Sequence, residues 1–403
     1  MSETASDQSS QLESGRQSPQ RGSAHVVHEI HWSDAFPWWN LFAAAGRAFS
    51  PAVLLLATAG FVSVWAGWSV VDRLIEIDGC ECGSPAMSLS PPSREAFPMS
   101  TKLIDALPTF VIEWCGTILT PFNPSASLGE AATALVRIGW FVIVWSIFGT
   151  AISRYVALRS VGEESRGLFG SFAYGLAKWP AAFNGAAVVL LGVMLLAVPG
   201  MLLGLLMRFD WGLAVVATVW PVVLAGGLIV AILALGLVAG WPLMVACIGV
   251  ERGDSFQAIS SAFSYVFQRP LHYAFYLAVA VVVFVPSLFA AAAIVDATNG
   301  LSVWAASWGM GHDRTSDVLE GLSRIAMGGV DAGGIDRPAG ESASAAWGTS
   351  MLDFWRRCLT AMLGAFVWAY VWSVVTAIYV LLRRDVDGTE LDEVVLNELP
   401  GEA

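Results

Sequence analysis

The chain has 403 residues, of which 56% are hydrophobic and only 13% are Asp, Glu, Lys or Arg. A soluble domain contains about 25% charged residues, so this composition argues against a soluble protein and is typical of one that spans a lipid bilayer. The net charge of -12 also argues against a nucleic-acid partner, because phosphate binding requires clustered Lys and Arg.

The N-terminal segment is polar and rich in Ser and Gln, which predicts a disordered tail over residues 1–30. It has no signal-peptide pattern, so the first membrane span is expected to act as an uncleaved insertion signal. His25, His28 and His31 recur at every third residue, a spacing that could hold Zn or Cu. Such histidines more commonly mark a polar tail that enters an aromatic interfacial segment, and we predict no metal site here.

Six long stretches without Asp, Glu, Lys or Arg are spread along the rest of the chain. The hydrocarbon core of a bilayer is about 30 Å thick, and a helix needs about 20 apolar residues to cross it. The stretches predict an all-α transmembrane domain over residues 31–385. Its spans are expected at about 51–71, 134–157, 183–207, 213–240, 273–294 and 359–382.

The fourth stretch leaves two interpretations open. Residues 211–250 would form about 60 Å of helix, which is twice the thickness of the hydrocarbon core. They could be one tilted span with an interfacial extension, or two spans that turn at Gly226 and Gly227. We prefer one span, because an internal repeat requires an even number of spans between its units.

The repeat consists of three short segments that each end at a proline: WNLFAAAGRAFSP (39–51), SRGLFGSFAYGLAKWP (165–180) and SFQAISSAFSYVFQRP (255–270). Each predicts an amphipathic surface helix that breaks before the proline, because the residue before Pro is disfavoured in the α region. Asp254 lies where an N-cap would be. The chain is therefore predicted to contain three hairpin units, at 31–160, 161–250 and 251–385, each with a surface helix followed by two spans.

Two loops connect the paired spans on the side opposite the surface helices, at 72–129 and 297–357. Within the first loop, residues 107–119 are apolar but too few to span, so we predict an interfacial or re-entrant segment. Cys80 and Cys82 are too close for an unstrained mutual disulfide. They could bind a soft metal or a redox partner, but loop thiols without such a role are commoner, and we predict no site.

Basic residues near the span ends indicate the orientation, because cytoplasmic segments of membrane proteins are enriched in Lys and Arg. More of them lie on the side of the surface helices, namely Arg47, Arg154, Arg159, Arg166, Lys178, Arg252, Arg269, Arg383 and Arg384. Fewer lie on the other side, namely Arg73, Arg137, Arg208, Arg356 and Arg357. We therefore predict a multi-pass protein of a bacterial inner membrane with both termini in the cytoplasm.

The C-terminal residues 386–403 are predicted to form a solvated acidic tail. The order D-V-D-G-T-E from Asp385 suggests a Ca²⁺ loop, but the third ligand position before the glycine is missing. Thr389, followed by Asp392, is more typical of the N-cap of a short helix over 390–398.

Four segments carry a resemblance to known proteins: HWSDAFPWWNLFAAAGRAF (31–49), GTAISRYVALR (149–159), GWPLMVACIGVERGDSFQAISSAFSYVFQRP (240–270) and IYVLLRRDVDGTELDEV (378–394). They resemble a group of uncharacterised multi-spanning membrane proteins of planctomycete-type bacteria. The pattern of surface helix and span is also similar to the membrane domain of some bacterial glycerophosphodiester phosphodiesterases, although no phosphodiesterase domain is present. Neither resemblance carries functional residues that can be transferred to this chain.

No spacing of residues predicts a catalytic site, a cofactor or a nucleotide-binding loop, and we predict a protein that is not an enzyme. Every acidic or basic residue lies at a span end, which argues against ion-coupled transport, since buried charges usually mark ion paths. The first hypothesis is a membrane-organising protein that contacts lipid and assembles with other membrane proteins. The alternative is a permease or lipid-handling transporter without ion coupling. An enzyme would require outward-facing groups such as Glu113, His312 and Asp313 to converge.

Overall fold

The computed structural model describes residues 36–77, 116–123, 126–162, 167–326 and 342–389. Every regular element in these ranges is a helix. The chain divides into two units, Met1–Trp39 and Asn40–Ala403. The first contains the short helix η1 (Pro37–Trp39), and the second contains all the longer helices that are described.

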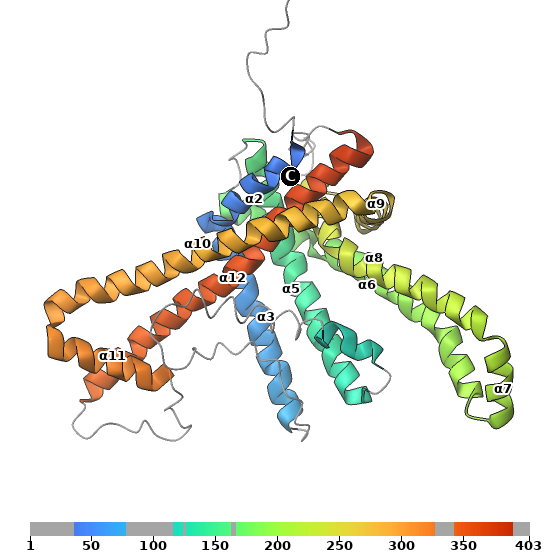
Figure 1. The fold of residues 1–403 in the computed structure, drawn as a ribbon, viewed down its shortest axis with the longest axis horizontal. Coiled ribbons are helices and arrows are strands. Elements are labelled where there is room, and N and C mark those ends of the chain that lie inside the picture. The colour runs from blue at the N-terminus through green and yellow to red at the C-terminus, as the bar shows by residue number, and fades with distance from the viewer. Residues whose placement is uncertain (1–35, 78–115, 124–125, 163–166, 327–341, 390–403) are drawn as a thin grey trace, which may run out of the picture. The chain divides into compact units, whose positions relative to one another are not determined.

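Figure 1 shows the helices of the second unit in chain order. They are α2 (Asn40–Ala48), α3 (Pro51–Ile77), η2 (Thr120–Phe122), α5 (Leu128–Ser160), α6 (Gly167–Leu206), α7 (Asp210–Thr218), α8 (Trp220–Glu251), α9 (Ser255–Gln268), α10 (Pro270–Met310), α11 (His312–Ala326) and α12 (Ala343–Asp387).

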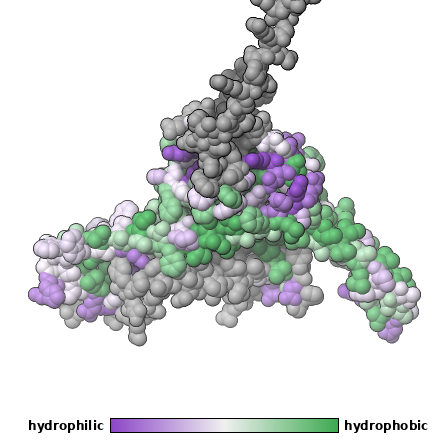
Figure 2. All heavy atoms as spheres, turned by 45° about the horizontal axis from the view of Figure 1, so that its top comes forward, coloured by the Kyte–Doolittle hydropathy of each residue, from purple (hydrophilic) through white to green (hydrophobic). Residues whose placement is uncertain are grey.

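Six of the described helices are long and apolar enough to cross a membrane, namely α3, α5, α6, α8, α10 and α12. Four of them, α3, α5, α10 and α12, cover a predicted span completely and extend beyond it, whereas α6 ends one residue before the end of its predicted span and α8 overlaps its predicted span only in part. The protein is therefore a multi-pass membrane protein with an all-helical transmembrane region. On the face seen in Figure 2, hydrophobic residues form a broad band, with hydrophilic residues on one side of it and again near the far ends of the α7 and α11 segments.

The fourth uncharged stretch contains one span. Gly226 and Gly227 lie within the continuous helix α8, which excludes a turn at that point. The predicted bounds 213–240 are wrong at both ends, because α7 is a separate helix and α8 continues to Glu251. Pro221 lies in the first turn of α8, where its missing N–H would have no intrahelical partner.

The proline that follows each predicted surface helix has one of two effects. α2 ends at Ala48 before Pro51, and α9 ends at Gln268 before Pro270, as predicted. The break predicted at Pro180 is wrong, because α6 runs without interruption from Gly167 to Leu206. Membrane helices tolerate an internal proline where neighbouring helices and local adjustment compensate the lost hydrogen bond, and α6 packs closely along α5 there.

The second predicted loop, 297–357, is largely helical where it is described. α10 continues to Met310, α11 follows after Gly311, and α12 begins at Ala343. Of the first loop, 72–129, the predicted interfacial segment 107–119 lies outside the described residues except for its last four positions, and Cys80 and Cys82 lie outside them altogether.

Three of the long helices, α5, α8 and α12, contact one another. At their meeting point, the Trp372 ring is 5.8 Å from both the Trp145 and Trp241 rings, measured between centroids. α3 and α6 pack on α5, α6 and α9 on α8, and α10 and α2 on α12. The internal repeat of three hairpin units stays a prediction, because helix contacts do not tell whether the three units share one structure.

α3 and α5 run antiparallel. Ser50, just before α3, has its hydroxyl oxygen 3.5 Å from that of Tyr155 near the end of α5. Toward the other end of α3, the Trp68 indole N–H donates to the Arg137 carbonyl oxygen at 3.2 Å. Arg137 also forms an ion pair with Asp72, and the two side chains are 8% and 20% exposed.

Replacing Arg137 by Leu is expected to destabilise the protein by about 3 kcal/mol, because Asp72 would keep a largely buried charge without this partner. Replacing both residues by Leu is expected to recover much of that loss, since a buried ion pair and an apolar pair of similar size are often equivalent in stability. Thermal unfolding in detergent measures both effects. A double variant no more stable than Arg137→Leu would contradict this role of the pair.

Candidate functional site

A group of polar side chains collects where α8, α9 and α12 come together. We call it the polar junction, and it consists of Glu251, Gln257, Tyr265, Tyr379, Arg383 and Asp387. None of these residues was a predicted site residue. Glu251 lies at its centre.

Glu251 is the last residue of α8, and the turn that follows leads directly into α9. Arg252 ends α8 in the left-handed conformation with φ of 61°, which is uncommon for a residue with a side chain. Asp254 then caps α9, because its carboxylate accepts a hydrogen bond from the Gln257 backbone N–H at 2.8 Å. The prediction of an N-cap at Asp254 is confirmed, and this tight turn holds α9 next to the end of α8.

The Glu251 carboxylate joins three elements. The Tyr379 hydroxyl of α12 donates to it at 2.5 Å, and the Gln257 amide of α9 donates at 2.7 Å. The Arg383 guanidinium forms an ion pair with it at 3.2 Å, and the two side chains are 14% and 13% exposed. Hydrogen bonds to charged groups are among the stronger ones in proteins, so Glu251 ties α9 and α12 to the end of α8.

Two further tyrosines bond to the end of α12. The Tyr265 hydroxyl of α9 donates to Asp387, and the Tyr276 hydroxyl of α10 donates to Asp385 at 2.7 Å. Burial, and after it the Asp387 carboxylate, raises the pKa of Tyr265 above its ordinary value, so its proton stays on the hydroxyl at physiological pH. α12 ends at Asp387 and is capped by Gly388, which has the positive φ of 70° that favours glycine.

This arrangement corrects the predicted acidic tail. We placed its start at residue 386, but α12 continues through Asp387 and that carboxylate is bonded to Tyr265. Tyr265 supplies the hydrogen bond that a solvated carboxylate would receive from water. The predicted helix over 390–398 lies outside the described residues.

Arg154 of α5 lies against the other side of the α8 end. Its guanidinium donates to the backbone carbonyls of Gly249 and Val250, both at 3.4 Å. The Tyr174 hydroxyl of α6 donates to the Ile248 carbonyl at 2.6 Å, and the Arg154 guanidinium carbon is 5.3 Å from the centroid of the Tyr174 ring. The last carbonyls of a helix carry a partial negative charge, so a cation is favourable at this point.

Beneath the polar junction lies a buried core of tryptophans and hydroxyls. The indole N–H groups of Trp145, Trp241 and Trp372 have no hydrogen-bond partner among the described residues. The same holds for four hydroxyls on α5 and α12, those of Ser146, Thr150, Ser153 and Ser373. Buried polar groups are usually hydrogen-bonded, so this core is polar and incompletely satisfied by the described side chains.

The carboxylates of the polar junction accept hydrogen bonds from tyrosines and cations that fix their positions. Within the described ranges, no group of three or more His, Cys, Asp or Glu side chains could hold a metal ion.

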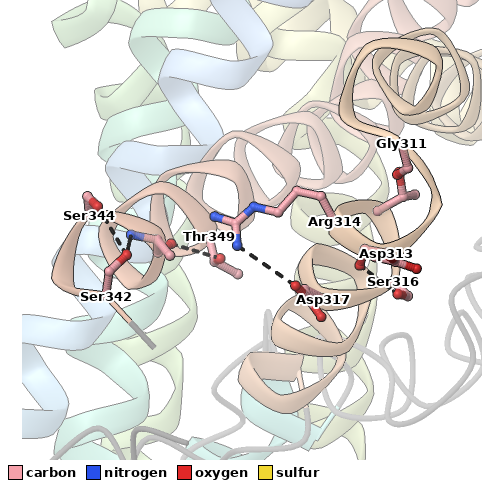
Figure 3. A network of polar contacts seen from close by, with 10 residues as sticks. Gly311, Asp313, Arg314, Ser316, Asp317, Ser342, Ser344 and Thr349 are labelled. Atoms are coloured by element: carbon pink, nitrogen blue, oxygen red, sulfur yellow. Dashed lines mark hydrogen bonds and ion pairs between the residues drawn. The ribbon is translucent and has the colours of Figure 1, made fainter. Parts of the chain in front are cut away.

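The residues weighed from the sequence as site candidates do not come together in the described part of the chain. His25, His28, His31, Cys80, Cys82 and Glu113 lie outside it. His312 and Asp313 are exposed residues in the first turn of α11. The Asp313 backbone carbonyl accepts a local hydrogen bond from the Ser316 hydroxyl at 2.7 Å, and Arg314 pairs with Asp317 at 3.9 Å (Figure 3).

No protein-family model, curated protein or solved structure matches the chain. The candidate site therefore has to be interpreted from its own geometry.

The polar junction could have been suspected from one signal in the sequence. Glu251 and Arg383 are opposite charges at the ends of two spans that were predicted to finish on the same side of the membrane. We used Arg383 only as evidence of orientation, and the tyrosines that complete the junction gave no separate signal.

Proposed function

We propose that this chain is a non-catalytic protein of a bacterial inner membrane that organises the membrane by assembling with other membrane proteins. The observation that carries the proposal is the uneven burial of the long helices. In the most apolar window of α8 only 6% of the residues are buried inside the chain, and in α6 17%, whereas the share in α12 is 72%. α12 is therefore mostly buried within this chain, whereas most of the surface of α6 and α8 faces outward.

The outward faces of α6 and α8 have properties that suit close contact with a transmembrane helix of a second protein. Large apolar side chains such as Met201 and Leu228 are 71% and 63% exposed. A Cβ atom added at Gly200, Gly204 or Gly227 would meet no other atom within 4 Å. Glycines four residues apart allow two membrane helices to approach closely, and packing rather than hydrophobic transfer drives their association in lipid.

Site-specific photo-crosslinking in the native membrane tests the proposal. A photoreactive amino acid at Met201 or Leu228 is expected to give a discrete protein adduct, identified by mass spectrometry. Val282 of α10, which is 72% exposed, serves as the matched position and is expected to give lipid adducts. Lipid adducts alone at all three positions would contradict assembly through α6 and α8.

The resemblance of four sequence segments to multi-spanning proteins of planctomycete-type bacteria supports the choice of membrane, and we propose membership of that group. The bias of basic residues supports a cytoplasmic position for both termini and for α2 and α9.

A second candidate function is passive permeation or lipid handling without ion coupling. The observation that favours it is the buried core, where hydroxyls on α5 and α12 and three indole N–H groups lack partners among the described residues. Such groups could line a path for a polar solute or a lipid headgroup. Translocation of a fluorescent phospholipid in proteoliposomes, reduced when Ser146 and Thr150 are replaced by Val, would support it, and vesicles no faster than protein-free ones would exclude lipid handling.

A further inference from the structure

Two arginines lie in the last turns of α2 and α5, the two helices that contact the first part of α3. Arg47 is in the last turn of α2, and Arg159 is in the last turn of α5. Burial, and after it the positive charge of Arg159, lowers the pKa of the Arg47 guanidinium from its ordinary value. Arginine nevertheless stays protonated in proteins, so two positive charges share this place.

Two hydroxyl groups connect the ends of α2 and α5. The Arg159 guanidinium donates to the Tyr155 hydroxyl oxygen at 2.8 Å, and the Ser50 hydroxyl is 3.5 Å from that same oxygen. The Ser50 backbone N–H donates to the Arg47 carbonyl at 2.9 Å, which keeps Ser50 next to the end of α2. We call Arg47, Ser50, Tyr155 and Arg159 the arginine cluster.

The arginine cluster contains no ion pair to a carboxylate among the described residues, in contrast to three other arginines. Arg137, Arg357 and Arg383 each form an ion pair with an acidic residue. Arg47 and Arg159 form none with any residue in the described ranges. Two like charges repel each other, and an anion bound between them would offset that repulsion.

The donors and the position of the cluster indicate which anion it suits. Guanidinium groups match the geometry of phosphate oxygens and often bind them with two parallel hydrogen bonds. The cluster lies at Ser50, directly before α3 enters its apolar stretch at Pro51, and therefore at the depth of the lipid headgroups. Basic pockets at this depth are a recurring mode of anionic lipid recognition.

We propose that Arg47, Arg159, Tyr155 and Ser50 form a binding site for a phosphate group, supplied by the headgroup of an anionic phospholipid. The two guanidinium groups hold the phosphate oxygens, and the hydroxyls add hydrogen bonds. The site does not depend on which side of the membrane α2 faces, because both leaflets present phosphate headgroups. It is also independent of assembly through α6 and α8.

Delipidated full-length protein in a neutral detergent provides the test. Phosphatidylglycerol, phosphatidylcholine and inorganic phosphate are added in turn, and thermal stability and lipid retention in native mass spectrometry are measured. We expect phosphatidylglycerol to raise the unfolding temperature and to be retained at low stoichiometry, with a much smaller effect of phosphatidylcholine. Arg47→Gln is expected to lower the apparent affinity for phosphatidylglycerol about tenfold or more.

The controls separate the site from general charge effects. Arg314→Gln removes an exposed arginine of α11 and is expected to leave the phosphatidylglycerol effect unchanged. If Arg47→Gln does not fold, Arg47→Lys takes its place in the test. Lysine keeps the charge but not the two-bond geometry, so Arg47→Lys is expected to have an intermediate affinity for phosphatidylglycerol. Equal loss in Arg47→Gln and Arg314→Gln, or an unchanged effect in both Arg47 variants, would overturn the proposal. Full stabilisation by inorganic phosphate, with no further gain from lipid, would overturn the assignment to a headgroup.

Discussion

Replacing Glu251 by Ala is expected to destabilise the protein by about 3 kcal/mol, as measured by thermal unfolding in detergent. The substitution removes the acceptor of the Tyr379 and Gln257 hydrogen bonds and the carboxylate that pairs with Arg383. Removing one partner of a mostly buried ion pair leaves the other charge poorly compensated, which typically costs about 3–5 kcal/mol. We take the lower end because Arg383 keeps other interactions.

Two further variants show whether the effect belongs to the polar junction. Glu251→Gln retains an oxygen that can accept from Tyr379, so its loss of stability is expected to be smaller than that of Glu251→Ala. Glu320→Ala removes an ion pair to Arg324 at 2.9 Å whose Arg and Glu side chains are 41% and 67% exposed. Exposed pairs contribute less than about 1 kcal/mol. Similar losses in Glu251→Ala and Glu320→Ala would show that the junction is not a structural tie.

Replacing Gly175 by Ala is expected to disrupt the contact between α6 and α5. A Cβ atom at Gly175 would lie 2.4 Å from the Ile147 carbonyl oxygen and 2.9 Å from the Ala151 Cβ. The Ile147 contact is with backbone, so the two helices would have to move apart. Overpacking of this kind costs about 1–3 kcal/mol, and we expect the upper part of that range.

The same helix offers a matched control for Gly175. A Cβ atom at Gly204 would meet nothing within 4 Å. Gly204→Ala is therefore expected to be neutral or to stabilise α6 by up to about 1 kcal/mol, because Ala is the better helix former. If both alanine variants lost the same stability, the close approach of α6 and α5 at Gly175 would be contradicted.

The spans could be predicted from the sequence because their signal is local. A run of uncharged residues long enough to cross a bilayer is visible without knowing any contact, and each of the six runs overlaps one helix long enough to span. The cap at Asp254 was predictable for the same reason, since an N-cap depends only on the first turn that follows it.

The parts that sequence reasoning missed depend on contacts between distant residues. Glu251 and Tyr379 are 128 positions apart, and their hydrogen bond follows from the parallel arrangement of α8 and α12. Pro180 carries the same local signal as Pro51 and Pro270, yet only there does the helix continue, along α5. The composition of residues 297–357 suggested a loop, but Asp313 in the first turn and Arg324 in the last turn of α11 are charges that suit a helix dipole.

We propose that α2 and α9 lie on the cytoplasmic side of the six spans and α11 on the opposite side, and cysteine labelling tests this topology most directly. Single cysteines at Ala43, Phe256 and Ser316, all exposed, are introduced into a chain whose native cysteines have been replaced. Those native residues are Cys80, Cys82, Cys115, Cys247 and Cys358. A maleimide that cannot cross membranes is then applied to spheroplasts, before and after permeabilisation.

Ser316→Cys is predicted to react in intact spheroplasts, and Ala43→Cys and Phe256→Cys only after permeabilisation. Labelling of Ala43→Cys and Phe256→Cys on different sides would contradict the number of spans between α2 and α9. The reverse pattern at all three positions would contradict the orientation.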